Sequence, residues 1–229
     1  RMRRMVPSDA VPAGEAGDRA VTQGRQVLAV VFVTALLMMA LVLLTGATKM
    51  PPYKRADWGG FIDQDSDCQD TRQEVLIRDS TKPVLWRENE DADRQCEVAW
   101  GRWVDPWSGE VLNDPAKIQI DHHVPLAAAH RAGGAAWSAS RKAIYANNLA
   151  FRWHLRATSA EMNQQKGDRG PDRWRPLRKE AWCEYALHYS AIKLTWGLSS
   201  PEAERLALRE MLMTCGRPET RTLLDPPQR

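Results

Sequence analysis

The 229-residue chain is long enough for one ordinary globular domain with an additional segment, and too short for an array of domains. Its formal net charge of +3 excludes a chain that is strongly basic or strongly acidic throughout. The charges are nevertheless uneven, because residues 51–120 contain 9 basic and 15 acidic side chains, whereas residues 121–180 contain 11 and 5.

An unbroken, almost wholly apolar run without charged residues extends from position 27 to 44. As a helix it would rise about 27 Å, close to the roughly 30 Å hydrocarbon core of a bilayer. We therefore expect residues 27–47 to be a transmembrane anchor in the lipid bilayer, after a disordered, arginine-containing cytoplasmic tail at 1–26. The small residues at 45–47 leave open a cleaved signal sequence and secretion, and a buried soluble helix is a third interpretation.

The four cysteines, Cys68, Cys96, Cys183 and Cys215, all follow this apolar run. An even number in the part expected outside the cytoplasm favours disulfides. Of the three possible pairings we favour Cys68 with Cys96 and Cys183 with Cys215, because each pair brackets one local segment. A zinc site, although no Cys-x-x-Cys pair is present, and free cysteines in a reducing compartment are the alternatives.

A short alternating stretch leads into a cluster of polar side chains. Ile118 and Ile120 predict a strand with one buried face, and the pattern stops at Asp121, His122 and His123 before a proline. A carboxylate oxygen can hold a divalent cation, and a neutral imidazole can take a proton from water. The cluster therefore points to hydrolysis.

A second polar stretch follows about forty residues later, on a predicted helix. Ser159 is expected to cap this helix, Glu161 lies in its first turn, and Gly167 ends it. Asn163 would offer an amide oxygen as a metal ligand, and Lys166, one turn later, would offer a cation for phosphate.

Together, Asp-His-x-Val-Pro at 121–125 and Asn-x-x-Lys-Gly-Asp at 163–168 resemble the HNH, or ββα-metal, endonuclease motif, in the form found in secreted or membrane-anchored actinobacterial proteins. The likeness extends over Trp58–Cys215 and includes Asp-x-Asp-x-Asp-Cys-x-x-Thr-Arg at 63–72. It implies an α+β fold, with a ββα-metal core, a helical insertion at 126–146 and C-terminal helices, after one transmembrane helix.

The resemblance also implies roles for the motif residues. Asp121 and Asn163 would bind one divalent metal ion, with Mg²⁺ or Mn²⁺ favoured by oxygen ligands and Zn²⁺ or Ni²⁺ as alternatives near histidines. His122 would be the general base, and Lys166 would contact the scissile phosphate or its neighbour.

One position departs from the family pattern. His154 stands where these proteins have an asparagine that orients the base through its backbone, so we expect His154, or else Asn147 or Asn148, to take that role. His123 replaces a usually apolar residue, and we expect it either to fill space in the core or to hydrogen-bond to a metal ligand. Asn148 is a second candidate for a hydrogen bond to a metal ligand.

The basic excess of residues 121–180 predicts a surface that follows nucleic-acid phosphates, with DNA or RNA as the substrate. Arg152, Arg156 and Arg169 are the arginines we assign to it. The alternative is a solvated face without a partner. No protein partner can be predicted from the sequence.

The acidic segment offers a weaker metal candidate. Asp63, Asp65, Asp67 and Glu74 match four ligand positions of a calcium loop, but Cys68 replaces the glycine of the sharp turn, and no flanking helices are expected. A solvated acidic turn held by a disulfide is the alternative to a Ca²⁺ site.

The remaining elements complete the domain that we expect at 58–215, after a linker at 48–57. Short strands are predicted around 75–77, 84–86 and 98–100. Two amphipathic helices are predicted after position 176, the second starting at Ser200-Pro201, and residues 216–229 are expected to be a polar tail.

The sequence thus predicts a metal-dependent endonuclease of low sequence specificity, anchored with its domain outside the cytoplasm or secreted. Two other functions stay open: a non-catalytic binding module at the cell surface, and a hydrolase of another phosphodiester.

Overall fold

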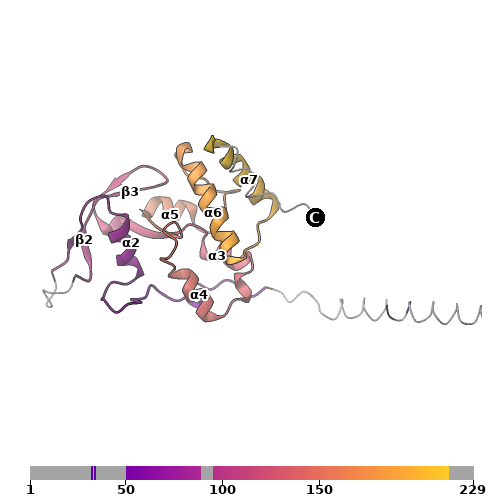
Figure 1. Cartoon of the computed structure of the whole chain (residues 1–229), viewed down its shortest axis with the longest axis horizontal. Helices are drawn as coiled ribbons and strands as arrows, with labels where there is room; N and C mark the ends of the chain where they lie inside the picture. The colour runs from indigo at the N-terminus through magenta and orange to yellow at the C-terminus, as the bar shows by residue number, and fades with distance from the viewer. Residues whose placement is uncertain (1–31, 33, 35–49, 89–94, 217–229) are drawn as a thin grey trace, which may run out of the picture. The chain divides into compact units, whose positions relative to one another are not determined.

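The computed structural model describes residues 32, 34, 50–88 and 95–216 (Figure 1). The part from Met50 onward forms one compact unit and is described by itself. The predicted anchor at 27–47 and both predicted tails lie outside the described residues, apart from Phe32, Thr34 and Gly216. In the described ranges, no helix has the length and hydropathy needed to cross a membrane.

This unit is a mixed α+β structure, as the sequence predicted at that level. The described strands form three two-stranded antiparallel sheets: β1 (Leu85–Trp86) with β2 (Val98–Trp100), β3 (Trp103–Val104) with β4 (Val111–Leu112), and β5 (Ile118–His122) with β6 (Leu155–Ser159). The α-helices are α2 (Thr71–Asp79), α3 (Leu126–Arg131), α4 (Ala139–Ala146), α5 (Ala160–Lys166), α6 (Trp182–Trp196) and α7 (Glu202–Leu212). The 3-10 helices are η1 (Arg55–Trp58), η2 (Pro115–Lys117), η3 (Gly134–Ala136), η4 (Lys179–Ala181) and η5 (Met213–Cys215).

The pair β5–β6 carries the polar cluster. Ile118 and Ile120 are buried on β5 and pack in one apolar cluster with Leu155 and Ala157 of β6, which confirms the alternating strand. Because the side chains of a strand alternate between its two faces, those of Gln119 and Asp121 point to the face opposite Ile118 and Ile120.

The helix α5 follows β6 directly and packs on β5 and β6. The Ser159 hydroxyl accepts a hydrogen bond from the Met162 amide at 3.2 Å. Gly167 ends the helix with a φ of +54°, a conformation that glycine adopts without a side-chain clash. The predicted cap and end of this helix are therefore confirmed.

The remaining helices build the larger apolar core. The insertion predicted at 126–146 is helical and is interrupted at Gly133, as expected. The two predicted C-terminal helices are α6 and α7, which lie side by side (Figure 1). Tyr185 and Tyr189 of α6 are fully buried against this core, together with Tyr145 of α4.

Both favoured disulfides are present. Cys68 is bonded to Cys96 and Cys183 to Cys215, with S–S distances of 2.00 and 2.06 Å, and no cysteine is free. The zinc-site and free-thiol interpretations are thereby excluded in this structure. The second bond ties the start of α6 to the end of η5.

The prediction of a strand around 75–77 is wrong, because these residues lie in α2. Asp70 caps that helix, since its Oδ1 accepts hydrogen bonds from the Arg72 and Gln73 amides. The run Val-Leu-Ile resembles a strand by propensity, but Val75 and Leu76 are buried on the helix. The expectation that no helix flanks the acidic loop is wrong for the same reason.

Candidate functional site

Most residues of the two motifs meet at one pocket of about 340 Å³. Strand β5 supplies four of its lining residues, Gln119, Ile120, Asp121 and His122, and Asn163 comes from α5. The rest of the lining comes from other segments: Arg55, Phe61, Arg72, Pro125 and Gly167. The structure therefore brings Asp121, His122 and Asn163 together.

His122 is held in one orientation by a backbone carbonyl. Its Nε2 lies 2.9 Å from the Ala146 oxygen, and because a carbonyl only accepts, Nε2 carries the proton and Nδ1 does not. Burial, with a contribution from His154, lowers the pKa of His122 to about 3. The imidazole is thus neutral at physiological pH and has a nitrogen able to accept a proton.

The carbonyl that orients His122 lies in a segment held by Asn147. The Asn147 Oδ1 accepts from the Ile62 amide at 3.2 Å and from the Thr71 hydroxyl at 2.7 Å. Its Nδ2 donates to the carbonyls of Gly60 and Ala143, each at 3.0 Å. Asn147 therefore anchors the segment whose Ala146 carbonyl orients His122, and it is one of the positions that the sequence left open for this role.

His154 supports the same segment from the other side. Its Nε2 lies 2.7 Å from the Tyr145 oxygen, and its carbonyl accepts from the His123 amide at 3.0 Å. Burial lowers the pKa of His154 to about 4, so it is neutral. The Asn148 side chain, by contrast, accepts from the Phe151 amide in an exposed local turn.

Asp121 forms a buried ion pair with Lys166. The Lys166 Nζ lies 2.6 and 2.8 Å from the two carboxylate oxygens and also donates to the His122 carbonyl at 2.7 Å. The side chains are 0% and 3% exposed for Lys166 and Asp121. The expectation that Lys166 faces a substrate phosphate is therefore not met, because its ammonium is turned inward to neutralise Asp121.

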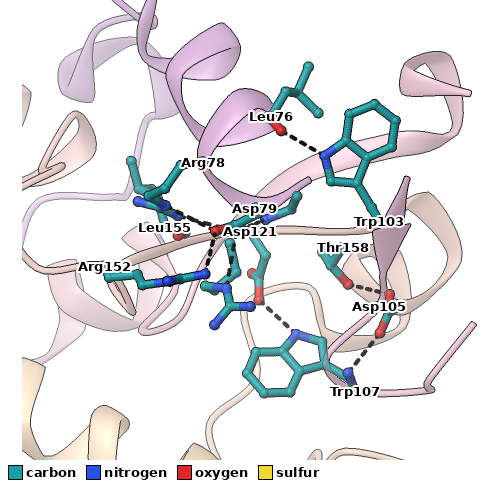
Figure 2. Close-up of polar contacts among 12 residues, drawn as sticks. Leu76, Arg78, Asp79, Trp103, Asp105, Trp107, Asp121, Arg152, Leu155 and Thr158 are labelled. Atoms are coloured by element: carbon teal, nitrogen blue, oxygen red, sulfur yellow. Dashed lines mark hydrogen bonds and ion pairs between the residues drawn. The ribbon is translucent and has the colours of Figure 1, made fainter. Parts of the chain in front are cut away.

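A tryptophan also contacts this carboxylate (Figure 2). The Trp107 Nε1 donates to Asp121 Oδ2 at 3.4 Å. Trp107 is itself fixed by buried Asp105, which accepts from the Trp107 amide and the Thr158 hydroxyl. Burial raises the pKa of Asp121, and the Lys166 ammonium offsets part of that rise.

Asn163 is oriented by a neighbouring amide. Its Nδ2 donates to Gln119 Oε1 at 2.7 Å, and its Oδ1 makes no hydrogen bond among the residues that the structure describes. The carboxylate of Asp121 and the amide oxygens of Asn163 and Gln119 fit a hard divalent cation in type and line one pocket. Because a carboxylate has about four lone-pair sites, Asp121 can share its oxygens between Lys166 and an ion.

His123 points away from this pocket, into the core against α6. Its Nε2 lies 2.9 Å from the Tyr185 oxygen, and its ring centroid is 4.6 Å from that of Tyr185. Burial lowers the pKa of His123 well below its usual value. His123 therefore packs as a neutral core residue beside the Asp121 and His122 positions.

The three arginines assigned to substrate do not line the pocket. Arg156 donates to buried Asp79 at 3.1 Å, and Arg152 lies 3.9 Å from the same carboxylate (Figure 2). Arg169 donates to the Gln165 carbonyl on an exposed surface. Arg55 and Arg72 line the pocket instead. Only Arg72 had a sequence signal, as the last residue of the motif at 63–72.

The acidic loop is compact but exposed. Ligand atoms of Asp63, Asp65 and Asp67 lie within 4.8 Å of one another, and no ion is needed to explain such an exposed group. Asp63 accepts hydrogen bonds from the Ser66 and Cys68 amides. Glu74 is not part of that group and lies on α2. The calcium interpretation gains no further support.

Comparison with known proteins gives one informative match. The chain is 35% identical over 178 residues to a protein of Arthroderma benhamiae described as an uncharacterized secreted protein, covering 76% of this chain and 83% of that one. No known family model matches the chain. No solved structure matches it either.

Proposed function

From the premise that the chain belongs to the family of this secreted Arthroderma benhamiae protein, we propose that it is a metal-dependent endonuclease that acts outside the cytoplasm with little sequence specificity. One observation carries the proposal: Asp121, His122 and Asn163 line the same pocket, and His122 is held with Nδ1 as its unprotonated nitrogen. The strand pair β5–β6 followed by α5 is the arrangement expected of an HNH, or ββα-metal, core.

The reaction would be hydrolysis of a phosphodiester bond. His122 Nδ1 would take a proton from the attacking water, while the Ala146 carbonyl holds the ring in place. Asn147 anchors the residue after Ala146, and His154 hydrogen-bonds to the carbonyl of Tyr145 before it, so both would act through His122.

Asp121 and Asn163 would hold the metal ion, and Gln119 would orient Asn163. A divalent ion supplies charge neutralisation at the phosphate and the leaving oxygen. Its oxygen ligands favour Mg²⁺ or Mn²⁺, with Zn²⁺ or Ni²⁺ as alternatives. A carboxylate already paired with Lys166 is expected to bind the ion weakly.

The two disulfides agree with an oxidising compartment outside the cytoplasm, in keeping with the secreted relative. Whether residues 27–47 remain as an anchor in the bilayer or are removed as a signal sequence decides between a membrane-bound and a released enzyme.

A second candidate is a non-catalytic binding module on the same fold. The observation that favours it is the Lys166 ammonium on both oxygens of Asp121, the position that would otherwise belong wholly to a metal ion. The third candidate is a hydrolase of another phosphodiester, which would use the same residues and would differ from the endonuclease only in the substrate that it cuts.

The test is cleavage by the oxidised unit from Met50 to Arg229, which is compact by itself. Supercoiled plasmid, RNA and bis(4-nitrophenyl) phosphate are each incubated with EDTA, Mg²⁺, Mn²⁺ or Zn²⁺. We expect metal-dependent cutting of nucleic acid that is lost in His122→Ala and kept in His188→Ala, a half-buried histidine outside the pocket.

If only the small diester is hydrolysed, the substrate is another phosphodiester. If the folded protein cuts nothing with any metal, the endonuclease proposal fails and the binding module takes its place.

A further inference from the structure

Arg72 lies in the wall of the pocket that contains Asp121, His122 and Asn163. Its Nη2 donates to the Pro115 carbonyl at 2.9 Å, which fixes the side chain. No carboxylate in the described part of the chain forms an ion pair with it. A guanidinium has five N–H donors in a planar fork, so most of those of Arg72 remain for a ligand.

The location of Arg72 is unfavourable for a cation that has only a structural role. It lies in the first turn of α2, where the helix dipole disfavours positive charge, and burial lowers its pKa, although the nearby Asp70 carboxylate offsets part of that fall. Arg156 is also largely buried, but it is compensated by the Asp79 carboxylate. Arg72 is therefore oriented and half-buried beside the pocket, with the Asp70 carboxylate near it but with no ion-pair partner among the described residues.

Arg55 adds a second cation to the same pocket from a separate segment. It belongs to η1, and its Nη1 donates to the Gly59 carbonyl at 2.5 Å. It too has no carboxylate partner within the described ranges. Two arginines from different elements thus line a pocket whose other polar residues are Gln119, Asp121, His122 and Asn163.

We propose that Arg72, assisted by Arg55, binds the phosphate next to the one that is cut, so that the site takes a phosphodiester chain and not an isolated diester. The fork of a guanidinium matches two oxygens of one phosphate. The inference rests on the proposed function for the identity of the scissile phosphate, while the anion site itself is independent of catalysis.

The experiment compares Arg72→Gln with Arg87→Gln, an exposed arginine outside the pocket, in the full chain. Steady-state kinetics are measured on a short DNA duplex and on bis(4-nitrophenyl) phosphate, which has no neighbouring phosphate. DNA binding in EDTA is measured by fluorescence anisotropy over a range of salt concentrations.

We expect Arg72→Gln to raise KM for DNA about tenfold and to reduce the salt dependence of binding by about one phosphate contact. Hydrolysis of the small diester should stay within about twofold, and Arg72→Lys should bind with intermediate strength. Arg87→Gln should change each value less.

Equal loss on both substrates would overturn the inference, because Arg72 would then act on the scissile phosphate or on the fold. If the wild type cuts neither substrate, the proposed function fails, and binding in EDTA still decides: weaker DNA binding by Arg72→Gln than by Arg87→Gln supports the anion site, and equal binding refutes it.

Discussion

Replacing Lys166 by methionine should destabilise the folded protein by about 3–5 kcal/mol, the usual cost of leaving one partner of a buried ion pair without the other. The Lys166 side chain is fully buried, and its Nζ lies 2.6 and 2.8 Å from the two oxygens of Asp121, which is itself 3% exposed. Methionine fills a similar volume, so the loss comes from the uncompensated carboxylate and from the His122 carbonyl, which loses a donor.

The double variant Asp121→Asn with Lys166→Met separates charge from packing. Because it removes both charges together, it should recover most of the stability lost by Lys166→Met alone. The resulting coupling free energy, on the order of 3 kcal/mol, is at the upper end for contacting residues.

The assay is urea unfolding followed by tryptophan fluorescence, in EDTA at neutral pH with the disulfides intact. Arg169→Met, at an exposed position, is the control and should stay within about 0.5 kcal/mol of the wild type. A loss below about 1 kcal/mol for Lys166→Met would refute the buried pair and favour a lysine that faces the substrate, as the motif had implied.

Two further predictions concern residues around His122, and a third concerns a disulfide outside the pocket. Burial lowers the pKa of His154 from 6.5 to about 4, so as the pH falls the unfolded chain binds the proton before the folded chain does. The free energy of unfolding should therefore be unaffected by His154 above pH 6.5 and should fall by roughly 3 kcal/mol between pH 6.5 and about 4. His154→Gln should flatten this part of the stability curve in urea unfolding, and an unchanged curve would contradict it. Asn147→Ala should lower the stability by about 1–3 kcal/mol and the cleavage rate at least tenfold, since the Ala146 carbonyl loses its support; an unchanged rate would show that His122 does not depend on it. Replacing Cys183 and Cys215 by alanine should lower the stability by about 2–4 kcal/mol but leave the cleavage rate within about twofold, because the bond lies outside the pocket lining.

Local patterns were sufficient where a single physical rule decides the structure. Alternation at Ile118 and Ile120 predicted β5, and the Ser159 cap and Gly167 predicted both ends of α5. The disulfide pairs also followed from sequence, because each closes a short segment, with separations of 28 and 32 residues.

Side-chain direction was not predictable in this way. Spacing placed Lys166 one turn after Asn163, but it could not show that the ammonium turns inward to Asp121 while the amide lines the pocket. The basic excess of residues 121–180 assigned Arg156 to the substrate, but Asp79, distant in sequence, lies beside it and forms an ion pair with it.

The support of the base shows the same limit. The family pattern placed this role first at His154, with Asn147 as an alternative, and in the structure the Asn147 amide donates to the Ala143 carbonyl in the segment that leads to Ala146. Its partners Ile62 and Thr71 lie about 80 positions away, and only the folded chain brings them together.

The most direct test of the central claim, that Asp121 and Asn163 hold the catalytic metal beside His122, is anomalous diffraction from crystals grown with Mn²⁺. We predict an anomalous peak in the pocket, about 2 Å from an oxygen of Asp121 and from Asn163 Oδ1. A peak only at Asp63, Asp65 and Asp67, or none, with the Lys166–Asp121 pair unchanged, would contradict the metal centre.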